Sequence, residues 1–258
     1  NGDALKVDKI WYSFPVAERH TVWIGPEIEN YYMLAATPSV YKPGALKAFK
    51  LGGHGSAFGA STSTGGGLKY EADNGFASSI TVNSKGAAGS KGLLTDEDEN
   101  KVNTMVAYTA DQYHLSYTYS KQHNGWDAWS YYATTDAASD STIDNADGHA
   151  LRAWWRPAET GSATPEVTVG YDYTTIADVA DTVDSTDAFF VGLTWQDMFQ
   201  ADDRIGLAFG QPQKRENESL DPFAWEAYYQ FQVNDSVSLT PAIFGGTDRN
   251  GSATADVT

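Results

Sequence analysis

The chain has 258 residues, no cysteine and a formal net charge of −17. Its length suits one large β domain or two ordinary ones, and without cysteine a disulfide framework is excluded. The acidic balance argues against a nucleic-acid partner, because proteins that bind nucleic acids carry basic surfaces. No apolar run approaches the ~20 residues of a membrane-spanning helix. A transmembrane β-barrel escapes that test, since only alternate residues of its strands face lipid.

The first half of the chain is rich in segments where polar and apolar residues alternate, which is typical of strands with two different faces. Strands are predicted at residues 6–16, 20–25, 57–72, 76–84, 102–109 and 113–120. Asp73-Asn74-Gly75 is a strong hairpin signal between two of them. Residues 26–56 form a long irregular stretch instead.

The second half continues the same pattern. Strands are predicted at residues 149–156, 167–173, 188–195, 204–213, 223–233 and 237–243. Long loops are expected at 121–148 and from 174 to 186, and much of the acid lies in such segments, which favours solvated loops over cation sites. Short and long connections therefore alternate along about a dozen strands. Sandwiches do not require this alternation, whereas outer-membrane barrels have short periplasmic turns and long external loops.

The stretch from Arg204 to Phe244 shows the two faces most clearly. Phe223, Trp225, Ala227, Tyr229, Phe231 and Val233 occupy every second position, and polar residues fill most of the gaps. The sequence thus predicts an all-β, antiparallel transmembrane barrel with an aromatic-rich face toward lipid. Aromatic residues near strand ends would form the interfacial girdles. These are Trp11, Tyr12, Trp23, Tyr108, Tyr119, Trp155, Tyr173, Trp195 and Trp225.

Alternation also predicts which polar side chains face the lumen. A charge on the lipid face costs about 2–4 kcal/mol at mid-depth, so charged residues in strands are assigned to the other face. The predicted pore-lining residues are Lys9, Lys69, Glu71, His114, Arg152, Asp172, Glu226 and Gln230. In a soluble sandwich the same residues would form the solvated face.

The order of these segments resembles the OprB-like porins, in particular the cyanobacterial branch known as SLH-domain iron-uptake porins. The resemblance lies in VDKIWYSFPVAERHTVWIG (7–25), GGGLKYEADNGFASSITV (65–82), IGLAFGQPQ (205–213) and AWEAYYQFQVNDSVSLTPAIF (224–244). It spans nearly the whole chain in the same order, and the last two segments are the most specific. It implies a 16-stranded, homotrimeric barrel in the cell outer membrane, in contact with lipid and lipopolysaccharide.

The resemblance also bears on domain organisation. Full-length members carry a signal peptide, a coiled coil and an SLH domain that contacts peptidoglycan. None of these is expected here, nor is the final aromatic-ended strand, so residues 1–258 are interpreted as an internal piece of such a barrel with two open edges.

The resemblance also predicts a constriction loop. The segment 26–56 corresponds in position to the long loop of the family, which would fold into the lumen and narrow the pore. Charged side chains in such a ring would select ions. The residues concerned are Glu27, Glu29, Tyr31, Tyr32, Lys42, Lys47 and Lys50. An ordinary external loop is the alternative.

No motif in the sequence indicates catalysis or a cofactor. Residues 96–99 lack the spacing and glycine of a calcium loop, the five histidines lack metal-site spacing, and no G-x-S-x-G elbow occurs. We therefore expect a passive, non-enzymatic diffusion channel for ions and small hydrophilic solutes, with inorganic iron or carbohydrates suggested by the resemblance. The net charge favours a mild cation preference if it faces the lumen. The alternatives are a non-conducting surface β protein with a structural or adhesive role and a carbohydrate-active sandwich.

Overall fold

The structure is a computed structural model. It describes residues 7–46, 48–49, 62–85, 94–95, 97–124, 126, 133–134, 143–178, 183–216, 218–248 and 256–257. Within these residues, fourteen strands form one antiparallel sheet, accompanied by a single-turn 3₁₀ helix, η1 (Asn30–Met33). No helix of this described part is long and apolar enough to cross a membrane.

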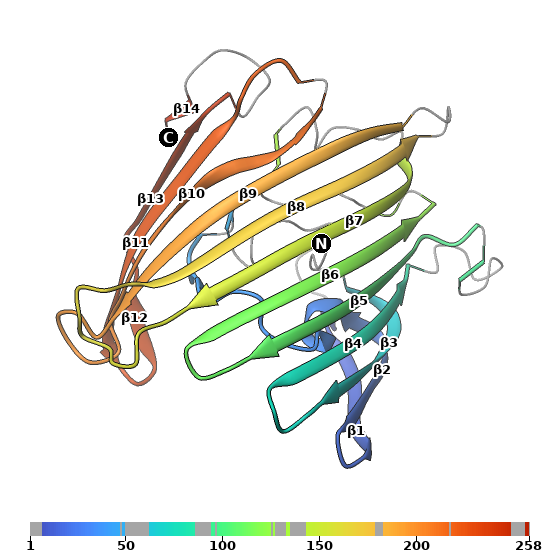
Figure 1. Cartoon of the computed structure of the whole chain (residues 1–258), viewed down its shortest axis with the longest axis horizontal. Coiled ribbons are helices and arrows are strands. Elements are labelled where there is room, and N and C mark those ends of the chain that lie inside the picture. The colour runs from blue at the N-terminus through green and yellow to red at the C-terminus, as the bar shows by residue number, and fades with distance from the viewer. Residues whose placement is uncertain are drawn as a thin grey trace.

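The strands pair with their neighbours in chain order (Figure 1). They are β1 (Ile10–Ala17), β2 (His20–Glu29), β3 (Thr62–Glu71), β4 (Phe76–Ser84), β5 (Asn100–Thr109), β6 (Tyr113–His123), β7 (Ile143–Trp155), β8 (Glu166–Asp178), β9 (Val183–Gln196), β10 (Arg204–Arg215), β11 (Phe223–Asn234), β12 (Val237–Leu239), β13 (Ala242–Thr247) and β14 (Asp256–Val257). The only branch of this described sheet is at β11, which pairs with both β12 and β13. Apart from the branch at β11, each strand therefore pairs with the strands next to it in the sequence.

The all-β, antiparallel prediction is confirmed, with twelve strands of six residues or more. Several strand boundaries were predicted wrongly. The predicted strand 237–243 is split into β12 and β13, because β11 pairs with each of them in turn. β7 begins at Ile143, so part of the predicted loop 121–148 is strand. β8 ends at Asp178 and β9 begins at Val183, so most of the predicted loop 174–186 is strand as well. The β8–β9 connection is therefore only residues 179–182, which breaks the predicted rule of long loops at that end. Acidic residues such as Asp147 and Asp187 are outward-facing strand residues rather than loop residues.

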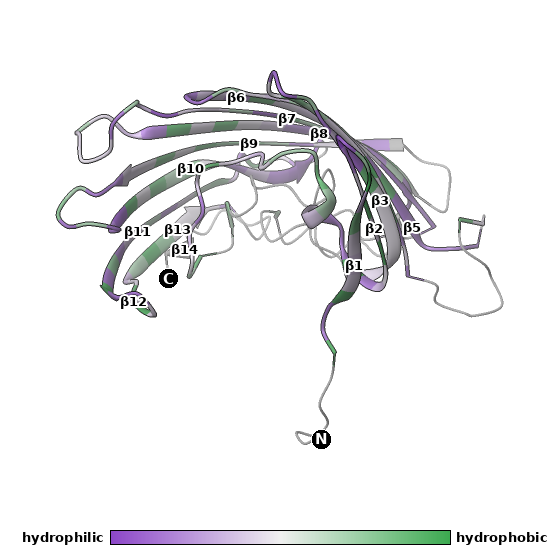
Figure 2. Ribbon diagram, turned by 90° about the horizontal axis from the view of Figure 1, so that it is seen from below, coloured by the Kyte–Doolittle hydropathy of each residue, from purple (hydrophilic) through white to green (hydrophobic). Residues whose placement is uncertain are grey.

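The sheet bends into an arch, and its two edges lie on the same open side (Figure 2). Among the described residues, β1 and β14 pair with only one strand each, so the described sheet is open. A closed barrel and the sixteen strands implied by the resemblance remain predictions. The concave side is called the inner face below, and the convex side is called the outer face.

The two faces differ as the alternation predicts. On β6, His114, Ser116, Thr118 and Ser120 point inward and are buried. Tyr113, Leu115 and Tyr117 alternate with them and are exposed on the outer face. A continuous belt of large exposed apolar side chains on neighbouring strands extends this outer surface. It includes Ile80, Val106, Leu151, Val169, Tyr171, Phe189 and Ile243.

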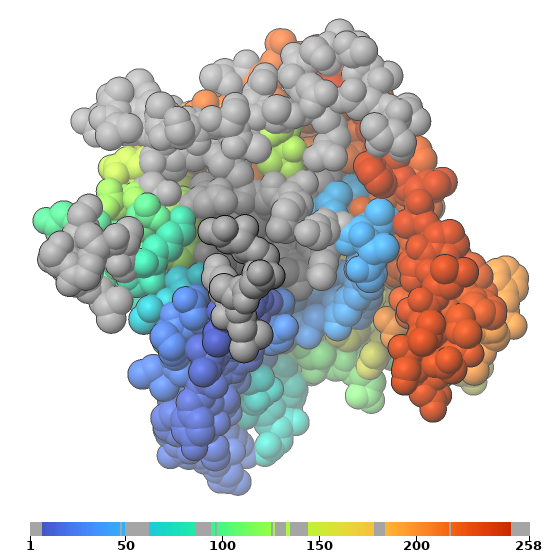
Figure 3. Space-filling view, turned by 180° about the vertical axis from the view of Figure 1, so that it is seen from behind, coloured from blue at the N-terminus to red at the C-terminus, as the bar shows by residue number. Residues whose placement is uncertain are grey.

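The chain after β2 turns into the concavity. This stretch, residues 30–46 with Ala48 and Phe49, is called the inner segment. Seen from the open side, it lies between the β1 edge and the β13 edge (Figure 3). Its first part packs Leu34 and Ala35 against Ala77, Met105 and Ala107. Its last part packs Tyr41, Leu46 and Phe49 against Phe190, Ala208 and Tyr228. The segment thus spans the interior from β4–β5 to β9–β11.

The β3–β4 hairpin depends on one glycine. Gly75 has φ of +89°, and a Cβ there would lie 2.2 Å from the Thr109 carbonyl oxygen of the adjacent hairpin. Gly161, in the β7–β8 turn, also has a positive φ, of +71°, but a Cβ there would meet its nearest atom at 3.3 Å. The two positions therefore share the backbone requirement and differ in free space.

We expect Gly75→Ala to lower the free energy of unfolding by more than the ~1–2 kcal/mol that a left-handed residue costs, because backbone overlap adds to that strain. Gly161→Ala is the matched control, because it imposes the same left-handed backbone conformation on alanine without the backbone overlap. Equilibrium urea unfolding of both variants in detergent measures the difference. Equal losses would show that contact with the β5–β6 turn does not matter.

Candidate functional site: the inner face and the inner segment

The inner face carries small polar side chains and a few charged ones. Besides the β6 residues, Ser79 and Asn83 on β4 and Thr168 and Thr174 on β8 point inward and are buried. The Thr81 hydroxyl and the Asn103 amide face each other across β4–β5 and have no protein partner in the described part of the chain. Buried polar atoms of this kind are normally hydrogen-bonded to water. The inner face therefore has the chemistry of a wet surface.

Six of the predicted site residues form three ion pairs. Lys9 pairs with Glu29, Lys69 Nζ lies 2.8 Å from Glu71 Oε1, and Arg152 Nη2 lies 2.7 Å from Asp172 Oδ2. The first two pairs are partly exposed, whereas Arg152 and Asp172 are buried. The predicted pore-lining charges are thus largely neutralised in place.

The Arg152–Asp172 pair is built into the wall. Arg152 Nη2 donates to both carboxylate oxygens, at 2.8 and 2.7 Å, and Nη1 donates to the Leu151 and Tyr171 carbonyls. The guanidinium lies 5.4 Å from the centre of the Phe190 ring, and Gly170 leaves the space that Arg152 and Phe190 occupy. A buried pair offsets its desolvation only with such additional hydrogen bonds. We interpret this pair as a structural part of the wall.

The inner segment is attached to four strands by hydrogen bonds. Ala35 N–H donates to Ser79 Oγ (2.9 Å), Trp154 Nε1–H to the Thr37 carbonyl (3.4 Å), Val40 N–H to Thr168 Oγ1 (3.2 Å) and Tyr41 O–H to Glu226 Oε1 (3.0 Å). The partners lie on β4, β7, β8 and β11. These contacts explain how a segment without strand structure holds a fixed course across the interior.

Tyr41 is the central contact of the inner segment. Burial, and then the neighbouring Glu226 carboxylate, raise the pKa of Tyr41 far above its usual range, so its hydroxyl stays a donor. Its ring meets Tyr228 edge-on at 5.8 Å between centroids. Its Cβ and Cγ also lie over Gly192, where an added Cβ would come within 2.8 Å of both atoms. Only glycine leaves room for the ring at this position.

The other predicted residues are more scattered. His114 is buried between Thr109 and Ser116 and stacks on Trp154 at 5.5 Å. Gln230 is half-buried on β11 beside Gly44. Glu27 and Glu29 belong to β2, which continues three residues past the predicted start of the loop at Pro26, so assigning them to a loop was wrong. Lys47 and Lys50 lie outside the described residues.

Two tryptophans predicted for the lipid interface face inward instead. Trp11 packs on Tyr32 of the inner segment, with 5.2 Å between ring centres, and Tyr32 stacks on Tyr31 at 4.4 Å. Trp23 lies beside Lys69, whose Nζ is 5.9 Å from the indole centre. Strand-end position alone does not distinguish an interfacial aromatic from an inner one. Tyr12, Tyr108, Trp155 and Tyr173 are exposed on the outer face, as predicted.

Three residues of the inner segment or of the wall beside it were missed: Tyr41, Trp154 and Arg156. Arg152, Trp154 and Arg156 stand at every second position, so extending the alternation of β7 by one residue would have predicted that Arg156 faces inward. Tyr41 lies in an irregular segment and contacts Glu226, 185 positions away. No periodicity reveals such a contact.

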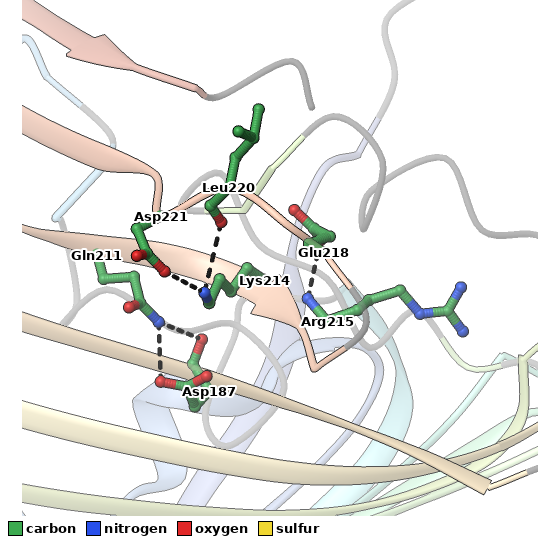
Figure 4. Close-up of polar contacts among 7 residues, drawn as sticks. All are labelled: Asp187, Gln211, Lys214, Arg215, Glu218, Leu220 and Asp221. Atoms are coloured by element: carbon green, nitrogen blue, oxygen red, sulfur yellow. Dashed lines mark hydrogen bonds and ion pairs between the residues drawn. The ribbon is translucent and has the colours of Figure 1, made fainter. Parts of the chain in front are cut away.

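At the opposite end, polar contacts order the ends of β9 and β10 and the loop that follows (Figure 4). Lys214 Nζ contacts Asp221 Oδ1 at 2.7 Å, and Glu218 accepts a hydrogen bond from the Arg215 backbone N–H at 2.8 Å. Gln211 Nε2 donates to Asp187 Oδ2 at 2.8 Å. The Lys214 ammonium lowers the pKa of the exposed Asp221 carboxyl. Among the described residues, no group of three or more His, Asp or Glu side chains could hold a metal ion.

We expect Gly192→Val to displace Tyr41 and detach the inner segment from β11. Losing the hydrogen bond to a carboxylate costs about 1.5–3 kcal/mol, which should speed amide exchange at residues 39–46 by roughly tenfold or more. Val191→Ile, on the other face of the same strand, is the control. Hydrogen exchange with mass spectrometry measures both, and unchanged protection in Gly192→Val would refute this attachment.

No protein-family model and no curated protein sequence matches the chain. Solved structures of similar fold include the outer-membrane-expressed OmpT of Vibrio cholerae, with a TM-score of 0.58, 12% identity, and coverage of 94% of this chain and 73% of that one. Another is Salmonella typhi OmpF in complex with daunomycin, with a TM-score of 0.52, 16% identity, and coverage of 87% and 66%. The chain thus spans about two thirds to three quarters of the length of these proteins. At such identities the likeness shows the fold alone: an antiparallel sheet like the walls of outer-membrane β-barrels.

Proposed function

We propose that this chain forms the wall of an outer-membrane channel through which ions and small hydrophilic solutes diffuse passively. The observation that carries the proposal is the contrast between the two faces of one sheet. Leu151 is 50% exposed on the outer face, whereas its neighbour Arg152 is 2% exposed on the inner face. Such a contrast suits a sheet with lipid on one side and a polar passage on the other.

The outer face supports the membrane assignment. Soluble monomers rarely expose an apolar surface that continues over many strands. Here large apolar side chains are exposed from β1 to β13, including Ile10, Leu68, Leu115 and Ile243. A bilayer would cover this surface, and the antiparallel ladder pairs the backbone groups that lipid could not satisfy.

The inner segment supports a constricted passage. Its four attachments hold it across the interior, and Tyr31, Tyr32 and Lys42 belong to it. We propose that it narrows the pore and that Lys69, Glu71 and Gln230 line what remains. No step of this transport requires a catalytic group or a cofactor; width and charge alone would select the solute.

The finer assignment rests on the sequence resemblance alone. By that resemblance the protein is a homotrimeric, OprB-like porin of a cyanobacterial outer membrane, with inorganic iron or carbohydrates as solutes. The predicted cation preference required that unpaired acidic side chains face the lumen. Glu29, Glu71 and Asp172 are paired with cations, so we propose that selectivity is weak and set by the few unpaired charges.

A non-conducting surface protein is the second candidate, because apolar packing fills part of the interior. Tyr41, Leu46 and Phe49 form a buried cluster with Phe190 and Tyr228, as in a plugged barrel. Either candidate should require detergent and migrate differently on gels before and after heating. Only the channel should carry current.

We expect the protein to produce stepwise currents in planar lipid bilayers. If the inner segment is the constriction, Gly192→Val should raise the single-channel conductance, because a detached segment obstructs less of the passage. Val191→Ile should conduct like the parent protein. The absence of steps would favour the non-conducting candidate, and steps of unchanged size in Gly192→Val would show that the inner segment does not limit flow.

The lipid assignment of the outer face has its own test. We expect Leu151→Arg to lower the free energy of unfolding in lipid vesicles by about 2–4 kcal/mol, as for a charge near the bilayer midplane. Leu151→Met keeps the apolar volume and should change little. If both variants unfold at the same urea concentration, water rather than lipid contacts this face.

A further inference from the structure

A pocket of about 790 Å³ opens at the short-turn end of the sheet, between the inner segment and the wall. Its lining comes from the inner segment, from β3, β4 and the turn between them, and from the ends of β5 and β7. Tyr31, Tyr32 and Trp154 supply aromatic surface, and Leu34 and Val40 supply aliphatic surface. The pocket is large enough for a ring-containing solute of modest size.

The charge of this pocket is opposite to that of the whole protein. Its lining holds three cationic residues, Lys42, Lys69 and Arg156, and one carboxylate, Glu71, for a net charge of +2 against −17 for the chain. Glu71 neutralises Lys69 at 2.8 Å. Lys42 is exposed and has no ion-pair partner in the described part of the chain.

Arg156 is the second cation without a carboxylate partner within the described residues. Its Nε donates to the Asp111 backbone carbonyl at 2.6 Å, and its guanidinium lies 5.3 Å from the Trp154 ring centre. These contacts orient the guanidinium and leave its charge uncompensated. A neighbouring cavity of about 590 Å³ shares Arg156 but is lined by Asp111, Glu159 and Glu166. Lys42 is therefore the cleaner probe of the first pocket.

Aromatic stacking in the pocket is already ordered. Tyr31 and Tyr32 stack with ring centres 4.4 Å apart, and Trp11 packs on Tyr32 with 5.2 Å between ring centres. Burial is the main cause that raises the pKa of Tyr31, so its hydroxyl stays protonated. A flat ring could lie against such a surface while an anionic group reaches the cations.

We propose that this pocket binds small organic anions that combine a planar ring with one carboxylate, and holds them at the short-turn mouth. The proposal deepens the channel function and rests on it for its biological meaning. A cation would meet two uncompensated positive charges, and an inorganic anion would leave the aromatic surface unused. An aromatic carboxylate uses both features.

The test is equilibrium binding of radiolabelled benzoate to the whole chain in detergent, by dialysis at low salt. Acetate lacks the ring, and benzyl alcohol lacks the charge, so both should bind more weakly than benzoate. We expect Lys42→Gln to raise the Kd for benzoate about 3–5-fold, as for loss of one exposed charge pair. Lys42→Gln combined with Arg156→Gln should weaken binding further, and added salt should do the same.

Lys121→Gln is the matched control, because Lys121 is an exposed lysine on the outer face at the far end of β6. Heat-dependent gel migration verifies that each variant is folded. Equal binding of benzoate and benzyl alcohol, or an unchanged Kd in both Lys42→Gln and the double variant, would overturn the proposal. Binding needs no current, so a conducting protein that ignores benzoate refutes the pocket alone. A benzoate-binding protein without conductance refutes the channel alone.

Discussion

The strict alternation of the two faces along each strand is the constraint on which the rest of this structure depends. Once strands pair in register, each inward residue lies beside an inward residue of its neighbours: Ala107, Ser116 and Arg152 are directly opposite one another on β5, β6 and β7. A slip by one residue would move Arg152 to the outer face and Leu151 inward. The polar interior and the apolar exterior therefore fix the register together, strand by strand.

The inner segment imposes a second demand, which is met by removing side chains from the wall. Tyr41 occupies the space over Gly192, and Met33 lies against Gly67. Within the wall, Tyr228, which Tyr41 contacts, covers Gly206. Ala188, Ala208 and Ala224 complete the thin wall under the last part of the segment. Glycine weakens a strand, yet here it allows an aromatic ring to approach the backbone closely. The course of the inner segment across the interior thus depends on small residues of β3, β9 and β10 as much as on the residues of the segment itself.

Sequence periodicity could predict the inner and outer faces because polar and apolar residues alternate within each strand, so each strand by itself shows which residues share a face. It failed where polar residues continue a strand on the outer face. Asp147 was predicted in a loop, but it is a strand residue that accepts a hydrogen bond from Tyr119. Asp187 likewise accepts one from Gln211. Strand ends that project beyond the apolar belt therefore remain paired and polar. Phase predicted the inward position of most charged residues of the candidate site. Arg152 and Asp172 pair between neighbouring strands, whereas Lys69 and Glu71 pair along one strand. Tyr41 and its contact with Glu226 could not be predicted, since an irregular segment has no period and the contact crosses the interior.

Pairing also separates the net charge of the chain from the charge that a solute would meet. Arg152 neutralises Asp172 within the wall, and Lys9 neutralises Glu29 at the start of the inner segment. Coulomb interactions in a polar passage fall off over about a Debye length, ~8 Å at physiological salt, so acid in outlying turns contributes little inside. In the proposed passage, the uncompensated charges at its surface would then dominate the field. In the pocket between the inner segment and the wall these are, among the described residues, Lys42 and Arg156, so this one pocket of an acidic protein is cationic where its aromatic surface is exposed.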